Sequence, residues 1–161
     1  MKHNYQDTIT WKQVVLIQDL TYEFVKLFKV EAFRADHMKR SARSEKQNMA
    51  EGATRNSVKD YIQFIGFARA SAEELLEDYR DIAKQWGISI WPKSDTRFNA
   101  LSSLSSLSSL TQVQALNLLV DLVIRTSYLL DQQRRGLERS FIEQGGYTEN
   151  LAQKRRNFRG F

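Results

Sequence analysis

The chain has 161 residues and a formal net charge of +5, and it contains one proline and no cysteine. The length fits one domain that can bury a core, and the lack of cysteine excludes disulfides, thiol nucleophiles and thiolate metal sites. The moderate positive charge permits contact with nucleic acid but does not require it.

The first residues show no basic segment leading into an apolar one, which a secretory signal would need. No stretch reaches 18 consecutive apolar residues, so the sequence predicts no membrane-spanning helix. We therefore expect a cytoplasmic protein with no membrane partner.

The first two predicted helices cover residues 10–31 and 35–52. Thr10 is the expected N-cap of the first helix, which carries apolar residues on more than one face. Because a helix in a lone bundle needs only one apolar stripe, part of this surface is expected to meet another subunit. The second helix has a weaker stripe, and Gly52 is expected to end it.

The third predicted helix, residues 57–86, has the most regular pattern in the chain. Ser57 stands three residues before Asp60, as in an N-terminal capping motif. Apolar residues then recur every seven positions, with a second set three residues behind each, as in a helix buried within a bundle. Gly87 fits the left-handed position that follows a helix end.

Residues 87–110 include the sequence LSSLSSLSSL, in which leucine recurs at every third position. This period does not match a helix face, and serine favours turns over helix interiors. We expect a long, loosely structured connection with at most one helical turn. The fourth predicted helix covers residues 111–143, beginning with Thr111 and Gln114 as a capping box and ending before two glycines.

Four amphipathic helices with mostly short links predict an all-α fold, an antiparallel up-down-up-down four-helix bundle over residues 1–146. Residues 147–161 form a basic C-terminal tail.

Three segments carry a family resemblance: SARS at 41–44, QNMAEG at 47–52, and residues 61–75. They resemble the N-I-A-E-G-like helix end and the F-L-x-x-A-x-G/A-S-x-x-E-L-like run of the four-helix bundle proteins named after intervening sequences in large-subunit ribosomal RNA. The resemblance covers roughly residues 10–140. The family's S-I-P is here Ser44-Glu45-Lys46, and the chain continues past the fourth helix. In both of these features the chain resembles the four helix bundle suffix subgroup of the family.

The resemblance implies a homo-oligomer, and in particular a pentamer. It also implies contact with nucleic acid, through a related branch, the accessory variability protein of diversity-generating retroelements. That branch binds nucleic acid and its reverse transcriptase through a basic surface.

The candidate nucleic-acid contacts are cations that could neutralise phosphates. They are Lys39, Arg40, Arg43, Lys46, Arg69, Lys154, Arg155, Arg156 and Arg159. Phe158 and Phe161 interleave with the charges of the tail and could stack on bases. The alternative interpretation is a solvated helix face and a frayed terminus.

Several apolar residues lie off the main stripes, and we expect them to form an oligomer interface. They are Leu16, Leu20, Phe64, Phe67, Leu118, Leu122 and Leu129. The alternative is a wider core within one chain. Asn48 and Glu51, near the end of the second helix, are expected to be structural, either as helix caps or as a buried hydrogen-bonded pair.

An acidic cluster lies on the third helix: Glu73, Glu74, Glu77, Asp78 and Asp81. A carboxylate-bridged di-metal site would need Glu-x-x-His on two helices, and the chain has only His3 and His37. We therefore expect ion pairs with Arg69, Arg80 and Lys84, with no metal and no cofactor.

The sequence contains no glycine-rich phosphate loop, no Ser-His-Asp arrangement and no HExxH helix, so we do not expect an enzyme. Two hypotheses remain. In the first, a homo-oligomeric bundle binds RNA or DNA through basic surfaces. In the second, the same oligomer is a scaffold that recruits a protein partner and binds no nucleic acid.

Overall fold

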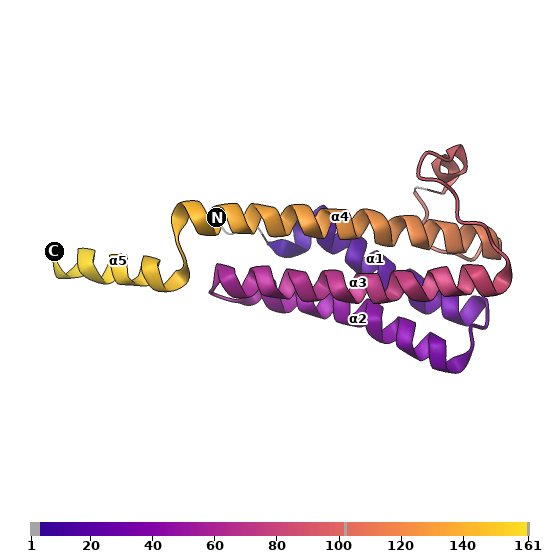
Figure 1. Ribbon diagram of the computed structural model, residues 1–161, viewed down its shortest axis with the longest axis horizontal. Helices are drawn as coiled ribbons and strands as arrows, with labels where there is room; N and C mark the ends of the chain where they lie inside the picture. Colours follow the sequence, from indigo (N-terminus) through magenta and orange to yellow (C-terminus); the bar gives the residue numbers. More distant parts are fainter. Residues whose placement is uncertain (1–3, 102, 161) are drawn as a thin grey trace.

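The computed structural model describes residues 4–101 and 103–160, and these residues form helices, turns and loops without strands. The elements are η1 (Tyr5–Asp7), α1 (Ile9–Leu27), α2 (Ala32–Thr54), α3 (Val58–Trp86), η2 (Thr96–Ala100), α4 (Gln112–Gln144) and α5 (Tyr147–Arg159). Helices α1 to α4 alternate in direction and pack side by side, while α5 extends beyond one end (Figure 1). This arrangement confirms the predicted all-α, antiparallel four-helix bundle.

The ends of α1 differ from the predicted range of 10–31. The N-cap is Thr8, whose hydroxyl accepts a hydrogen bond from the Trp11 amide at 3.2 Å, so Thr10 is not the N-cap. The helix ends at Leu27, and Lys29 follows with a positive φ of 50°. A left-handed residue directs the chain away from the helix axis.

The caps expected for α3 and α4 are present. The Ser57 hydroxyl accepts from the Asp60 amide at 3.3 Å, and Gly87 follows α3 with a φ of 67°. At α4, the Thr111 hydroxyl accepts from the Gln114 amide at 3.2 Å, and the Gln114 side chain accepts from the Thr111 amide at 3.0 Å. These local motifs set both helix starts.

Gly52 does not end α2, as the sequence had suggested, but lies buried in its last turn. A Cβ at this position would stand 2.7 Å from Cβ of Phe64 and 2.8 Å from Cδ2 of Tyr61. Both of those residues belong to α3. The missing side chain therefore lets α2 and α3 approach closely where they meet, and α2 continues to Thr54.

The core consists of two clusters of buried apolar side chains. The larger cluster reaches from Ile17 on α1 to Val123 on α4 and includes Trp91 and two leucines of the connection. The smaller cluster lies nearer the α5 end of the bundle and contains Val14, Met49, Ile65, Ala68 and Leu130. Buried polar residues separate the clusters along the helices. They are Glu45 on α2, Ser71 on α3 and Thr126 on α4.

The connection between α3 and α4 is more ordered than predicted. Leu101 and Leu107 are buried in the core, and the amide of Leu107 donates to the Glu23 carboxylate of α1 at 2.9 Å. The amides of Leu101, Leu104 and Leu110 each donate to the carbonyl three residues earlier. A three-residue period therefore places leucine at successive turns, which suits a chain of turns although it does not suit an α-helix.

Helix α4 contains a long apolar segment. By length and composition, a window within Gln112–Arg159 could cross a membrane, and 56% of that window is buried inside the protein. A core helix of a bundle passes the same test, so this one helix is weak evidence for a membrane span.

The close approach at Gly52 makes a prediction for Gly52→Ala. The added methyl group would collide with α3, and overpacking of this kind costs about 1–3 kcal/mol of unfolding free energy. The matched control is Gly66→Ala on α3, where an added Cβ would meet nothing within 4 Å. That control should gain roughly 0.5–1 kcal/mol, because alanine favours a helix over glycine. Urea unfolding of both variants measures the difference, and equal effects would contradict the steric account.

Candidate nucleic-acid interface

Four of the predicted contact residues lie on α2. Arg40 and Arg43 are exposed, whereas Lys39 and Lys46 are half-buried. Arg40 forms an ion pair with Asp36 one turn earlier, at 3.1 Å, and both side chains are well exposed. Exposed pairs of this kind are weak and easily exchanged, so Arg40 stays available to an anionic ligand.

Arg69 does not join this group. Its guanidinium lies 3.0 Å from Asp131 on α4, so it belongs to the contact between α3 and α4. Asp131 also pairs with Arg134 at 3.1 Å and with Arg135 at 2.9 Å. The hydrogen bond from Arg134, together with the charges of Arg135 and Arg69, holds the pKa of Asp131 below its usual value. Three cations around one carboxylate make an ion-pair network that bridges the helices.

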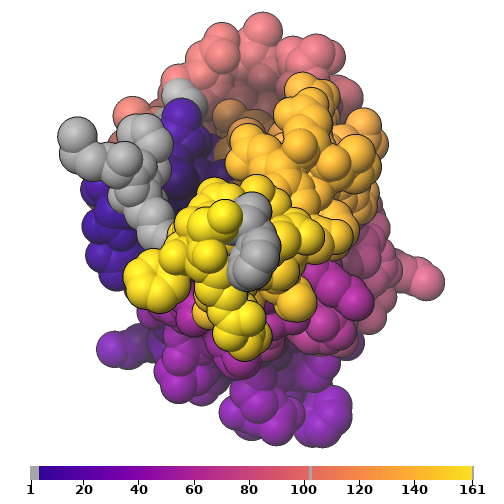
Figure 2. Space-filling view, turned by 90° about the vertical axis from the view of Figure 1, so that its left-hand side faces the viewer, coloured from indigo at the N-terminus to yellow at the C-terminus, as the bar shows by residue number. Residues whose placement is uncertain are grey.

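The tail forms a helix, α5, which the sequence analysis did not predict. It begins after Gly145 and Gly146, where the Glu149 carboxylate accepts a hydrogen bond from the Gly146 amide. None of its residues is buried, and Figure 2 shows it in yellow in front of the end of the bundle. The tail is therefore a helix that projects from the bundle and not a frayed terminus.

The cations of α5 are all exposed. Arg155, Arg156 and Arg159 line one shallow surface together with Ala152. Arg156 donates to the Gln153 side chain at 2.7 Å, and no ion pair among the described residues uses the tail's cations. Of the predicted basic residues, those of α5 form the most open group.

The positive charge of the chain is concentrated at this end. Residues 125–159 contain eight Lys or Arg against four Asp or Glu, so they carry four of the five net charges. Sequence reasoning singled out the tail but missed Arg134, Arg135 and Arg139 in the second half of α4. These three arginines lie within six residues of one long helix, and this clustering could have indicated a basic surface on α4.

Asn48 and Glu51 have separate structural contacts. The Asn48 side chain donates to the Ser44 carbonyl at 2.9 Å and to the Ser44 hydroxyl at 3.1 Å. That hydroxyl accepts from Ser71 of α3 at 2.9 Å, so Asn48 supports a contact between helices. Glu51 is exposed and pairs with Arg55. The hydrogen-bonded pair between Asn48 and Glu51, one of the two expected alternatives, is not formed.

The residues predicted for an oligomer interface divide by exposure. Leu20, Leu118 and Leu122 are buried within the single chain, so for them the alternative of a wider intrachain core is correct. Leu16, Phe64 and Leu129 are half-buried, and Phe67 is exposed. The error arose because α1 and α4 are each buried on more than one side, which a single-stripe pattern does not anticipate.

The acidic cluster forms ion pairs. Arg80 reaches Glu77 at 2.5 Å and Glu73 at 3.5 Å. Across to α2, Asp78 accepts from His37 at 2.5 Å. The partners are therefore Arg80 and α2 residues, whereas Arg69 pairs elsewhere. Among the residues described, no group of three or more acidic or histidine side chains is placed to hold a metal ion.

Glu45 is the most unusual polar residue of the bundle. Its side chain is completely buried, and neither carboxylate oxygen has a hydrogen-bond partner in the described part of the chain. Burial raises the pKa of this carboxyl from 4.5 to about 8, because the charged form loses its hydration. At neutral pH, Glu45 is therefore mostly a neutral acid.

The comparison with protein families decides the relationship suggested by the helix-end motif. The model of the family described as "23S rRNA-intervening sequence protein" matches residues 6–109. The chain belongs to this family. The match begins four residues before the expected range of 10–140 and ends 31 residues before that range does. It covers α1, α2, α3 and most of the connection to α4. Neither the curated proteins nor the solved structures that were compared contain a match.

This family has no known catalytic role. Glu45 lies within the residues that the family model matches. The matched region therefore includes a titratable group in the core.

The buried carboxyl predicts an unusual pH dependence of stability. Between pH 4.5 and about 8, the unfolded chain has lost the Glu45 proton while the folded chain keeps it. The unfolding free energy should therefore fall with rising pH by about 1.4 kcal/mol per unit in this range, and level off above it. Glu45→Gln should remove this decline and be more stable than the parent at pH 8.

Denaturant unfolding at pH 5, 6, 7 and 8 measures the slope. Glu74→Gln is the matched control, because Glu74 is exposed on α3, and it should keep the slope of the parent. A Glu45→Gln variant with an unchanged slope would show that Glu45 is already ionised in the folded protein.

Proposed function

We propose that this chain is a non-catalytic, cytoplasmic homo-oligomer that binds RNA or DNA through basic surfaces. The family resemblance suggests five subunits. The observation that carries the proposal is α5, a fully exposed helix with Lys154, Arg155, Arg156 and Arg159 on its surface. Each of these cations could neutralise a phosphate and release a counterion.

The second half of α4 supports this proposal. Its arginines are largely engaged in the Asp131 network, yet they add to the positive potential at the same end of the bundle. A field of this kind attracts a polyanion before any specific contact forms. Arg40 and Arg43 on α2 supply a second exposed basic surface.

Oligomerisation would strengthen both surfaces. One α5 helix offers few phosphate contacts, so its affinity alone would be modest. Several copies on one assembly engage the same polyanion together, and the later contacts are intramolecular. The proposal therefore connects the oligomer to the binding activity.

The alternative function is a protein-interaction scaffold without nucleic-acid binding. Large exposed apolar side chains on one side of α4 favour it, among them Ile124 and Tyr128. Such residues on the surface indicate contacts with other proteins when they gather into a patch. The two functions differ in whether binding depends on phosphate and salt.

Fluorescence anisotropy with a labelled RNA and a labelled duplex DNA across a salt series tests the proposal. We expect binding that weakens steeply as salt increases. The variant R155E/R156E/R159E should weaken it and reduce the slope of log K against log salt by about 0.9 for each lost duplex phosphate contact.

The matched control is K26E/K29E/K84E, which changes the net charge equally at exposed lysines near the opposite end of the bundle. It should keep most of the binding. If neither nucleic acid binds at the lowest salt while the oligomer is intact, the scaffold function is correct. If both triple variants lose binding equally, only the net charge matters and α5 is not an interface.

A further inference from the structure

The helix α5 has an apolar face in addition to its arginine face. Tyr147, Leu151 and Phe158 stand at spacings of four and seven residues, so they share one side of the helix, and Lys154 lies on that side between Leu151 and Phe158. All three are exposed, Phe158 to 93%. An isolated helix of 13 residues is only marginally stable in water. This stripe is therefore a surface that association would cover.

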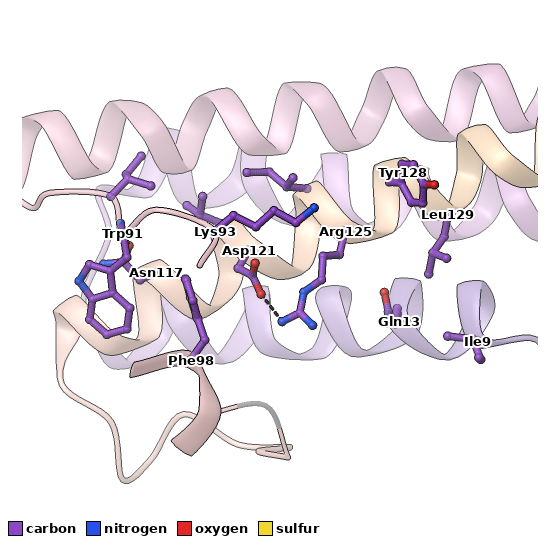
Figure 3. A pocket seen from close by; sticks show the side chains of 13 residues that line it. Ile9, Gln13, Trp91, Lys93, Phe98, Asn117, Asp121, Arg125, Tyr128 and Leu129 are labelled. Carbon is purple, nitrogen blue, oxygen red and sulfur yellow. Dashed lines mark hydrogen bonds and ion pairs between the residues drawn. The ribbon is translucent and has the colours of Figure 1, made fainter. Parts of the chain in front are cut away.

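A matching surface exists on the bundle. A groove of about 500 Å³ lies between α1, the α3–α4 connection and α4, and Figure 3 shows the residues around it. Ile9, Ile90, Ile124 and Tyr128 contribute exposed apolar surface, with Tyr128 exposed to 64%. Four large apolar residues from three elements make a continuous docking surface and not scattered surface positions.

The groove is held in shape by its own contacts. The Trp91 amide donates to the Asn117 side chain at 2.7 Å, which ties the connection to α4. The Arg97 guanidinium lies 4.0 Å from the centre of the Trp91 ring, and Phe98 packs on that ring edge to face. Asp121 and Arg125 pair along the wall. A preformed groove loses little conformational entropy on binding.

The dimensions of helix and groove agree. Along α4 the groove extends from Asn117 to Leu129, which is about 18 Å at 1.5 Å per residue. The apolar stripe from Tyr147 to Phe158 extends about 16 Å by the same rise. One α5 helix therefore has the length needed to lie along the groove.

The helix α5 of the same chain does not reach this position. Ile124 lies about 30 Å back along α4 from its last residue, Gln144, whereas the part of α5 from Tyr147 to Phe158 is only about 16 Å long. An α5 folded back on its own α4 would leave Tyr147 and Leu151 beside the second half of α4. In Figure 1, α5 instead points away from the bundle.

We propose that α5 of one chain docks its Tyr147–Leu151–Phe158 stripe into the α1–α4 groove of a second copy. The inference deepens the oligomer of the proposed function and rests on that part of it, but it does not require nucleic-acid binding. The contact is head-to-tail, so the same two surfaces recur on every subunit and can close a ring. Arg156 remains on the side of α5 away from the groove, and Arg159 lies at the flank of the helix.

The natural absence of cysteine allows a direct test by cross-linking. Leu151→Cys and Tyr128→Cys are introduced into separate chains, which are mixed and oxidised. We expect a disulfide-linked pair of twice the 18.8 kDa chain mass, which reducing agent removes. Gln153→Cys is the matched control, because residue 153 lies on another side of α5, and it should form several-fold less of the linked pair with Tyr128→Cys.

Light scattering on the unlabelled chain provides the second measurement. The double variant Leu151→Asp/Phe158→Asp places two negative charges on the apolar stripe. Its weight-average mass should fall from that of the parent oligomer toward that of one chain. The exposed α5 contributes nothing to the core, so the bundle should keep its helical signal. An unchanged mass, equal cross-linking by the control, or a disulfide within one doubly substituted chain would each overturn the docking.

The same samples separate this inference from the proposed function. Cross-linking without salt-dependent binding of RNA or DNA supports the docking and overturns nucleic-acid binding. Binding without cross-linking overturns the docking alone. A parent chain that is monomeric at every concentration overturns the docking and the oligomer together.

Discussion

The antiparallel pairing of α2 and α3 is the contact on which the bundle depends. Arg34 pairs with Asp81, His37 with Asp78, and Ser44 with Ser71, so one register holds along both helices. At their junction the register ends at Gly52, where only a hydrogen atom fits against Phe64. Helix α1 then packs on α2, and α4 packs on α3. A slip in this pair would misplace the other two helices.

The charges of the protein serve two different purposes. Arg69 joins α3 to α4 through Asp131, which Arg134 and Arg135 also contact, so these cations stabilise the bundle. The cations of α5 form no such ion pair with the residues that the structure describes. Counting basic residues in the sequence treats these groups alike, whereas the structure separates cations that stabilise the bundle from cations that face the solvent.

Much of the fold could be predicted because it is encoded locally. Ser57, Gly87 and Thr111 fix helix ends through hydrogen bonds or backbone conformation within a few residues. The roles of residues that depend on partners far away in the sequence were harder to predict. In the sequence, Gly52 has the pattern of a helix end, and only the contact with α3 shows its packing role. Leu118 lies off the main apolar stripe of α4, and only the packing of the bundle shows that it is buried.

The candidate site was less predictable for the same reason. The tail's cations were evident from composition. Its helix begins with the contact between Glu149 and Gly146, and a basic, polar sequence gives little indication of that contact. The ion pair of Arg69 with α4 could not be found without the tertiary arrangement. Glu45 has a polar side chain at a position that the helix period assigns to the core, and that conflict was the available signal.

The division of the core into two clusters has a consequence for motion within the folded state. The smaller cluster, around Met49 and Ile65, has few members and lies at the α5 end. The larger one is reinforced by the leucines of the connection. Because a buried polar layer interrupts the cooperative apolar contact between them, the α5 end can open without global unfolding. Backbone amides there should exchange with solvent through a lower-energy opening than those beside Tyr79. The end that carries most of the charge is thus also the more adaptable part of the bundle.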